Sequence, residues 1–290
     1  SRKGILKLYL TLVKLKPEII FSTLTVTNVI VSLIKPFLFF KCKFILREST
    51  ILSVNNERLK NKYFYNGIIR LIYPSFDKII AQSDDMILDL VKNYNIPSSK
   101  IIKINNPITN VRGLNSKIYN SKHPVFITIG NLRPEKGYDR MIEMLARLKF
   151  EFTYYIIGDG EMRHSVECAI KKYQLTENVV ITGRISNTHD FLKLADIYLQ
   201  TSYYEGFPNA LIEAIECGLP AIAYDAPGGT SEIIIDGENG YLVRNGDVSA
   251  FVEKLSHLIR NPLEKNKVRE SVINRFSSEL FIRKIHEALQ

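Results

Sequence analysis

Several features that mark common active sites are missing from this 290-residue sequence. Its three cysteines, Cys42, Cys168 and Cys217, are scattered and form no C-x-x-C pair. This pattern favours a reducing cytosol over a disulfide scaffold. The five histidines stand alone and none precedes His123, so no metal site and no Cys–His or Ser–His pair is apparent. No G-x-G-x-x-G segment follows a strand pattern, which argues against a dinucleotide oxidoreductase.

Long apolar runs are also missing. Residues 30–46 form an apolar stretch, but Ser32, three lysines and Pro36 interrupt it, whereas a membrane-spanning helix needs about 20 apolar residues. The stretch is better explained by a buried helix that ends near Lys35, a turn, and a strand over Lys43–Arg47. A shallow interfacial contact by the apolar residues 37–40 is an alternative. No cleavable signal peptide is recognisable, and we expect the protein in the cytoplasm.

The charge is unevenly distributed along the chain. Residues 1–120 contain 19 Lys and Arg against 7 Asp and Glu, a net charge of +12, and residues 121–290 contain 20 against 23, a net charge of −3; together they give +9. The asymmetry suggests two domains with different partners. Nucleic acid is one candidate, but no nucleic-acid-binding motif accompanies the charge. An anionic membrane surface is the second candidate, and a general surplus of solubilising charge is the third.

Strand and helix patterns alternate along the second half of the chain. Strands are expected at Val125–Ile129, Thr153–Ile157, Val179–Thr182, Asp196–Gln200 and Ala221–Tyr224, and helices at Tyr138–Lys149, Glu161–Tyr173, His189–Leu194 and Ala210–Cys217. Such alternation predicts an α/β fold with a doubly wound parallel sheet. Ligands bind such sheets at the carboxyl ends of the strands. Asp159 is expected to cap the helix that follows it.

The first half shows the same alternation less clearly. Strands are expected at Pro17–Phe21, Phe44–Leu46, Lys78–Ala81 and Ile101–Ile104, and helices at Thr27–Ile34, Lys62–Ile72 and Asp84–Asn93. The chain is long enough for two domains of ordinary size. We therefore expect two domains of this α/β type.

Two glutamates, Glu205 and Glu213, enclose the segment that says most about function. The first follows a buried strand, and the second lies in the helix that stops at Gly218. The residues between them allow a turn that leaves backbone N–H groups at the helix N-terminus, where phosphates bind. Carboxylates on both sides of an anion site suit a ligand with hydroxyl groups at both ends. A nucleotide diphosphate sugar has this layout.

The segment resembles the E-x7-E motif of retaining GT-B glycosyltransferases of family 4, the glycosyl transferases group 1. Four further segments resemble motifs of that family and come in the family's order: Ile129–Gly137, Ile156–Gly160, Val179–Ile185, and Ala226–Ile233 followed by Gly237–Val243. Each motif alone is a weak signal, above all the Gly-Asp-Gly turn. The combination is specific and implies the GT-B fold, in which two Rossmann-like domains face each other across a cleft.

The resemblance also implies roles for individual residues. Glu205 would bind hydroxyls of the donor sugar, Lys136 would neutralise the departing diphosphate, and Glu213 would hold the ribose hydroxyls. The family commonly has an arginine where this chain has Asn131, and Arg133 is the candidate that replaces its charge. The other implied donor-binding residues are Gly130, Gly158, Arg184, Ile185, Gly206, Phe207, Pro208, Asn209, Ala210 and Leu211.

The resemblance further predicts the domain organisation. We expect an acceptor-side domain over residues 1–108, a linker over 109–122, a donor-binding domain over 123–275, and a C-terminal helix over 276–290 that returns toward the first domain. Family members begin with a strand and a glycine-rich loop, and this chain begins at what resembles a later helix. The first domain is therefore expected to lack its first part.

The expected activity is that of a retaining, metal-independent hexosyltransferase that needs no cofactor. It would move a hexose or N-acetylhexosamine from a nucleotide diphosphate sugar, a UDP-sugar rather than a GDP-sugar, to a glycan or lipid-linked glycan. The pathway would be synthesis of cell-surface polysaccharide or lipopolysaccharide, at the inner face of the membrane. Two alternatives stay open: a catalytically incomplete nucleotide-sugar-binding module or partner subunit, and a different enzyme on the same scaffold, such as an epimerase or a glucan synthase.

Overall fold

The computed structural model describes residues 2–108, 113–114, 119–120 and 122–290. The chain forms two compact units. The first contains the residues up to Asn106 together with Phe281–Gln290, and the second contains Pro107–Leu280. Most of the predicted linker, residues 109–122, lies outside the described residues.

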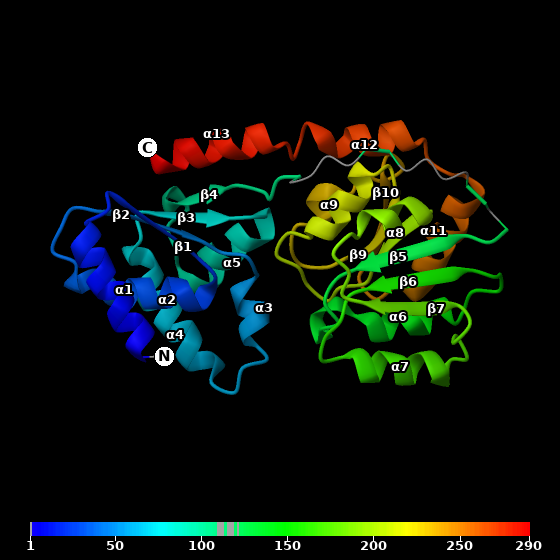
Figure 1. Ribbon diagram of the computed structural model, residues 1–290, viewed down its shortest axis with the longest axis horizontal. Coiled ribbons are helices and arrows are strands. Elements are labelled where there is room, and N and C mark those ends of the chain that lie inside the picture. Colours follow the sequence, from blue (N-terminus) through cyan, green and yellow to red (C-terminus); the bar gives the residue numbers. More distant parts are fainter. Residues whose placement is uncertain (1, 109–112, 115–118, 121) are drawn as a thin grey trace. The chain divides into compact units, whose positions relative to one another are not determined.

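The first unit is built on a parallel sheet with the strand order β1-β2-β3-β4 (Figure 1). Its strands are β1 Ile19–Thr23, β2 Lys43–Arg47, β3 Lys78–Ala81 and β4 Ile101–Lys103. Its helices are α1 Arg2–Leu15, α2 Thr25–Ile34, α3 Leu52–Asn56, α4 Lys62–Ile72 and α5 Asp84–Tyr94, with short 3-10 turns at Lys35–Phe37, Tyr73–Ser75 and Ser98–Lys100. Because helices cover both sheet faces, the central strands β2 and β3 contain continuous buried apolar runs, whereas the edge strand β1 alternates between exposed and buried residues.

The two faces of this first sheet have separate cores. On one face, apolar residues of α2, α4 and α5 pack against Phe44, Leu46 and Ile79. On the other face, Ile45 and Ile80 pack with the C-terminal helix α13, Ser278–Leu289. The last ten residues of the chain thus belong to the first unit, although the helix that carries them begins in the second.

The second unit contains a parallel six-stranded sheet with the order β10-β9-β8-β5-β6-β7. Its strands are β5 Val125–Ile129, β6 Thr153–Ile157, β7 Val179–Gly183, β8 Ile197–Gln200, β9 Ala221–Asp225 and β10 Gly240–Arg244. Its helices are α6 Tyr138–Leu145, α7 Arg163–Lys172, α8 His189–Leu194, α9 Asn209–Glu216, α10 Thr230–Ile233, α11 Val248–Arg260 and α12 Lys265–Ile273, with a 3-10 turn at Pro134–Lys136.

Alternate residues of the central strands face opposite cores. Phe126 of β5 faces a core with α6, α7 and α11. Its neighbour Ile127 faces a second core with α8, α9 and α12. The strand order places β5 and β8 side by side in the middle of the sheet, although β6 and β7 separate them in the sequence. The predicted fold class, two Rossmann-like doubly wound units, is confirmed.

Most predicted elements are found within two residues of their predicted bounds. The largest difference is in α6, which ends at Leu145 rather than continuing to Lys149. The amides of Arg147 and Leu148 bond three residues back, to Met144 and Leu145, which tightens and ends the last turn. The helix at which the chain was expected to begin is α1, whereas α3, α10, α11, α12 and β10 had no counterpart in the sequence analysis.

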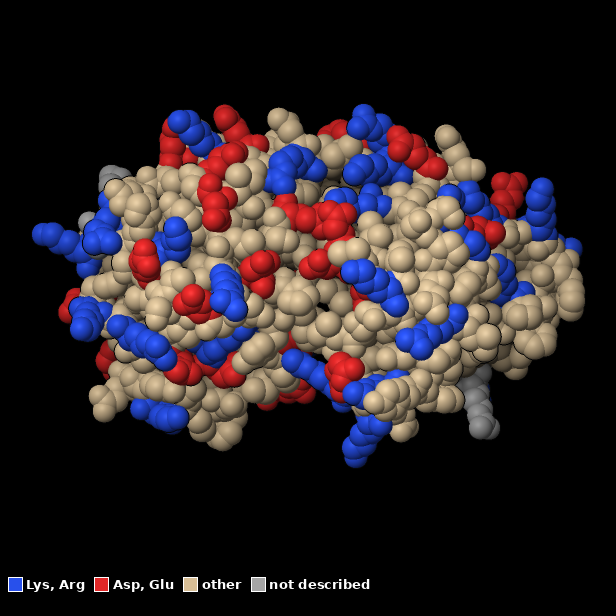
Figure 2. Space-filling view, turned by 180° about the vertical axis from the view of Figure 1, so that it is seen from behind, with Lys and Arg blue, Asp and Glu red and all other residues tan. Residues whose placement is uncertain are grey.

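Charged side chains of both signs share the surface. On the face shown in Figure 2, Lys and Arg lie among Asp, Glu and uncharged residues, without a large area of one sign. The basic surplus of the first 120 residues is therefore not gathered into one patch on this face.

Candidate active site

The site lies at the carboxyl ends of β5 and β8, within the second unit. A cavity of about 370 Å³ opens there, between the loop that follows β5 and the loop that leads from β8 into α9. Of the predicted residues, nine line it: Gly130, Asn131, Lys136, Glu205, Phe207, Pro208, Asn209, Ala210 and Glu213. Residues separated by up to 83 positions in the sequence thus share one cavity.

Lys136 and Glu205 form an ion pair at the cavity wall. The Lys136 ammonium donates hydrogen bonds to both carboxylate oxygens, at 2.8 and 3.0 Å. The Ser202 hydroxyl donates a third, at 2.6 Å to Oε1. The Glu205 side chain is only 10% exposed, so these donors offset much of the cost of removing its charge from water. The structure therefore brings together two of the three residues predicted to be catalytic.

The loop that carries Glu205 is held by backbone contacts as well. The Glu205 amide donates to the Pro227 carbonyl at 2.9 Å, and the Gly229 amide donates to the Gly206 carbonyl at 3.0 Å. Both partners come from the Ala226–Ile233 segment, one of the motifs recognised in the sequence. This segment therefore supports the loop through hydrogen bonds and does not line the cavity.

Helix α9 presents its N-terminus to the same cavity. Pro208 occupies its N-cap position, and no side chain there accepts a hydrogen bond from the first turn. The Leu211 and Ile212 amides donate to the Pro208 carbonyl, at 3.2 and 3.4 Å. The positive end of the helix dipole still makes this end suited to an anion. Glu213, five residues into α9, is half-buried and also lines the cavity. A diphosphate at the helix end would thus have one carboxylate on either side.

The loop after β5 rests directly on the loop after β6. Gly158 has φ +153°, and a Cβ there would lie 2.0 Å from the carbonyl oxygen of Gly130. Only glycine allows this conformation and this contact. The Gly130 amide also donates to the Ile157 carbonyl at 3.0 Å. Gly158 therefore supports the cavity wall from behind and does not line it.

Two buried tyrosines fix the floor of the cavity. The Tyr138 hydroxyl donates to the Gly130 carbonyl at 3.0 Å, and that of Tyr198 donates to the Ile129 carbonyl at 3.4 Å. Burial raises the pKa of both phenols, with the nearby Glu205 carboxylate adding to the rise. Both hydroxyls consequently stay protonated at neutral pH and act as hydrogen-bond donors rather than bases.

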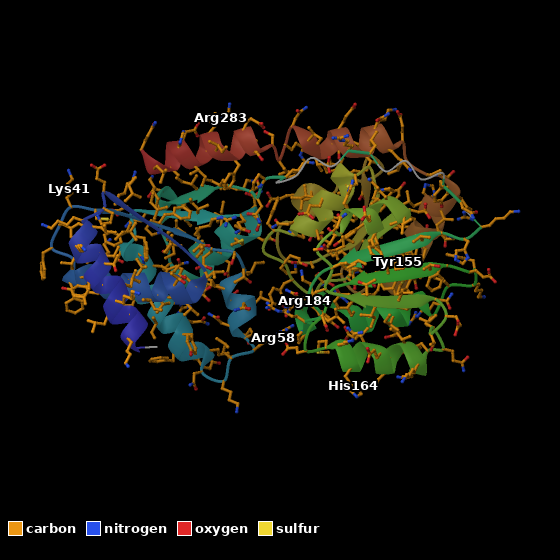
Figure 3. The ribbon with its side chains drawn as sticks, in the orientation of Figure 1. Lys41, Arg58, Tyr155, His164, Arg184 and Arg283 are labelled. Atoms are coloured by element: carbon orange, nitrogen blue, oxygen red, sulfur yellow. The ribbon has the colours of Figure 1, made fainter. Side chains whose placement is uncertain are left out.

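Six predicted residues lie elsewhere. Arg133 is exposed, and its guanidinium is 3.9 Å from the Glu135 carboxylate, on the side of the loop that faces α7. It does not bring its charge into the cavity beside Asn131. Arg184 is exposed just beyond the end of β7 (Figure 3), and Ile185 packs beside the second core. The rest are Gly158 behind the wall, Gly206 in the loop backbone and Leu211 in the core.

The sequence analysis missed a group of polar residues at the ends of the two central strands. Those that line the cavity are Thr128, Gln200, Thr201 and Ser202. The signal was present, since buried β8 ends in consecutive polar residues. Of the four, only Ser202 donates to Glu205, and this contact needed the structure. Among the described residues no cluster of His, Cys, Asp and Glu could hold a metal ion, and no helix has both the length and the apolarity to cross a membrane.

The fold and the site place this chain in a known class. A parallel two-unit α/β architecture, with an E-x7-E segment across a helix N-terminus, defines a GT-B glycosyltransferase fold. The profile of the family described as glycosyl transferases group 1 matches residues 114–275, more than half of the chain. The chain belongs to this family.

Individual relatives are distant. The chain is 28% identical over 243 residues to N-acetylgalactosamine-N,N'-diacetylbacillosaminyl-diphospho-undecaprenol 4-alpha-N-acetylgalactosaminyltransferase of Campylobacter jejuni. The match covers 81% of this chain and 64% of that protein, so the chain spans less than two thirds of the relative's length.

Solved structures show the same fold. The lipopolysaccharide outer core galactosyltransferase WaaB matches with a TM-score of 0.79 and 21% identity, over 99% of this chain and 79% of that one. Anabaena Alr3699/HepE in complex with UDP-glucose matches with a TM-score of 0.82 and 19% identity, over 98% of this chain and 81% of that one.

Proposed function

We propose that the protein is a retaining hexosyltransferase that uses a UDP-sugar without a metal ion or cofactor. The observation that carries the proposal is the cavity in which Lys136, Glu205, Glu213 and the start of α9 converge. Family membership supports glycosyl transfer. The fold match to a structure that holds UDP-glucose supports the choice of UDP. The donor diphosphate would lie at the α9 N-terminus, the ribose at Glu213 and the sugar at Glu205.

The site suits a displacement on one face of the sugar. The bond from the sugar's anomeric carbon to the diphosphate oxygen breaks while the acceptor oxygen bonds to the same face of that carbon. The acceptor's hydroxyl proton passes to a diphosphate oxygen. No protein nucleophile is required. The protein's contribution is to position both substrates and to stabilise the negative charge that develops on the diphosphate, through the Lys136 ammonium and the amides at the start of α9.

Calorimetric titration with UDP and GDP, with no metal present, tests the donor site. We expect UDP to bind more tightly than GDP. The Glu213→Ala variant should bind UDP about tenfold more weakly, because a hydrogen bond to a charged group contributes about 1.5–3 kcal/mol and about 1.4 kcal/mol is tenfold in affinity.

The matched control is Glu253→Ala, which removes an exposed carboxylate from α11. It should leave UDP binding unchanged. Unaltered UDP affinity in the Glu213 variant would exclude the proposed ribose contact. UDP binding without turnover of any UDP-sugar would favour a nucleotide-sugar-binding module over an enzyme.

We further propose that the acceptor is a lipid-linked glycan in cell-surface polysaccharide synthesis, met at the cytoplasmic face of a membrane. Acceptor recognition by the Campylobacter jejuni relative, whose name includes diphospho-undecaprenol, supports this choice. Helix α4 of the first unit supplies a surface for it. The helix exposes Tyr63, Phe64 and Leu71 to solvent, and the basic residues Arg58 and Lys60 precede it. Exposed aromatics beside lysines suit the interface of an anionic bilayer.

Sedimentation with lipid vesicles tests this contact. The protein should bind vesicles that contain phosphatidylglycerol and not vesicles of phosphatidylcholine alone. Replacing Tyr63 and Phe64 by serine should weaken binding about tenfold, since each buried aromatic contributes about 1 kcal/mol or more. Leu194→Ser, at an exposed apolar position on α8, is the control. Equal binding of both vesicle types would argue against the proposed contact.

A further inference from the structure

Arg140 lies outside the cavity and connects α6 to the loop that leads from β8 into α9. Its guanidinium donates to the backbone carbonyls of Thr201 and Ser202, through Nε and Nη2 respectively. Its third nitrogen, Nη1, donates to the Asn245 side-chain oxygen at 2.7 Å. In the part of the chain that the structure describes, the guanidinium has no ion pair with a carboxylate. It is therefore bound almost entirely by backbone and amide oxygens.

Two aromatic rings hold the guanidinium in this orientation. Its central carbon lies 4.1 Å from the ring centroid of Tyr203 and 4.5 Å from that of Tyr224. Tyr203 is itself fixed, because its hydroxyl donates to the Asp139 carboxylate at 3.0 Å. A planar guanidinium can stack on rings and donate a fork of hydrogen bonds in its own plane at the same time. An ammonium group has neither a planar face that stacks nor a rigid fork of donors.

These hydrogen bonds, together with the chain between Lys136 and Arg140, form a closed cycle of contacts that includes the Lys136–Glu205 ion pair. Lys136 and Arg140 lie four residues apart on one segment, and Ser202 and Glu205 lie three apart on the other. Arg140 holds the Ser202 carbonyl, the Ser202 hydroxyl donates to Glu205, and Glu205 pairs with Lys136. Any shift of the Ser202 backbone would therefore move the Glu205 carboxylate.

Other hydrogen bonds already join the same segments. The Thr201 hydroxyl donates to the Gly137 carbonyl at 2.8 Å, and the Tyr203 amide donates to the Glu135 carbonyl at 2.7 Å. Gly137, at φ +64°, lets the segments approach so closely that a Cβ there would lie 2.1 Å from the Thr201 oxygen. These contacts join the segments independently of Arg140, so we expect variants of Arg140 to fold.

We propose that Arg140 is a positioning residue that holds the Glu205 carboxylate where it can contact the hydroxyls of the donor sugar. This inference rests on the proposed transferase function. It acts on the sugar end of the donor through Ser202 and leaves the nucleotide end, at Glu213 and α9, untouched. Loss of Arg140 consequently affects the rate of sugar transfer more than the binding of UDP.

The test compares Arg140→Met, Arg140→Lys and the control Arg147→Met. Arg147 lies in the turn that ends α6 and pairs on the surface with Glu143 at 3.1 Å. With the UDP-sugar that the wild type turns over fastest, kcat of Arg140→Met should fall about 30-fold, since a small misplacement of a reacting group can cost up to about 100-fold. The UDP dissociation constant should change less than about twofold. Arg140→Lys should recover little of the loss, and Arg147→Met should match the wild type.

Two outcomes would overturn the proposal. Full activity of Arg140→Lys would show that charge alone is required. A parallel loss of kcat, UDP affinity and melting temperature in Arg140→Met would show a general destabilisation instead. Amide hydrogen–deuterium exchange gives an answer that does not depend on turnover. In Arg140→Met, exchange should accelerate at residues 202–205 and not in α11. If the wild type binds UDP and transfers no sugar, the proposed function fails, and the exchange result still decides the role of Arg140.

Discussion

The Glu205→Gln variant is expected to lose about 100-fold or more in kcat, while its dissociation constant for UDP changes less than threefold, because a preorganised group aimed at the reacting centre contributes about 10²–10³ in rate. Glutamine has the shape of glutamate but cannot accept charge-assisted hydrogen bonds from sugar hydroxyls on both oxygens. It also leaves Lys136 without its anionic partner at 2.8 Å. The measurement is steady-state kinetics with the preferred UDP-sugar, beside calorimetry with UDP.

A second variant, Ser202→Ala, changes the same site more mildly than Glu205→Gln. Ser202→Ala removes only the 2.6 Å hydrogen bond to Glu205 and should lower kcat by about threefold to tenfold, the effect of about 1 kcal/mol. If Glu205→Gln reduces UDP affinity as strongly as it reduces kcat, Glu205 does not act at the sugar, and the assignment of the two ends of the cavity is wrong.

The strands of the second unit could be predicted closely from the sequence. β5 and β6 occupy their predicted residues because each is a short apolar run bounded by polar or turn residues. The ends of helices were harder to predict from the sequence, because they depend on local hydrogen bonds. The predicted cap at Asp159 is wrong: α7 begins at Arg163 with Met162 in the cap position. The Asp159 carboxylate instead accepts the Gly160 amide within the turn, at 2.8 Å.

The site could be predicted as a list of residues but not as an arrangement. Motif spacing indicates that Lys136 and Glu205 lie at strand ends. Their contact follows from the pairing of β5 with β8, and strand order is not encoded in the local pattern of either strand. The direction in which a loop side chain points could not be predicted from the sequence either. Arg133 lies three residues from Lys136, yet its side chain is 60% exposed and lies beside Glu135.

Arg140 shows why some positions cannot be found from sequence at all. An arginine near the start of an amphipathic helix is most often a solvated surface charge. Here its partners are backbone carbonyls from a segment more than 60 residues away. A backbone carbonyl has no sequence signature, so only the folded structure reveals the contact.

Replacing Lys136 by methionine should affect both steps that involve the diphosphate. UDP binding should weaken about tenfold, because a charged hydrogen-bond donor is lost from a partly buried site. The value of kcat should fall about 100-fold, since the charge on the leaving diphosphate increases in the transition state. Methionine keeps most of the side chain's volume, and Lys193→Met, at an exposed position on α8, controls for the change in net charge.

A double variant distinguishes two explanations of that loss. If Lys136 acts only by holding Glu205, adding Lys136→Met to Glu205→Gln should cost nothing further, because the shared interaction is already removed. If Lys136 also stabilises the diphosphate, the double variant should lose about tenfold more in kcat than Glu205→Gln alone. We expect the second result, because the Lys136 side chain is 26% exposed and lines the cavity that the start of α9 also lines. Equal rates for the single and double variants would reduce Lys136 to a positioning residue and leave α9 as the diphosphate's main partner.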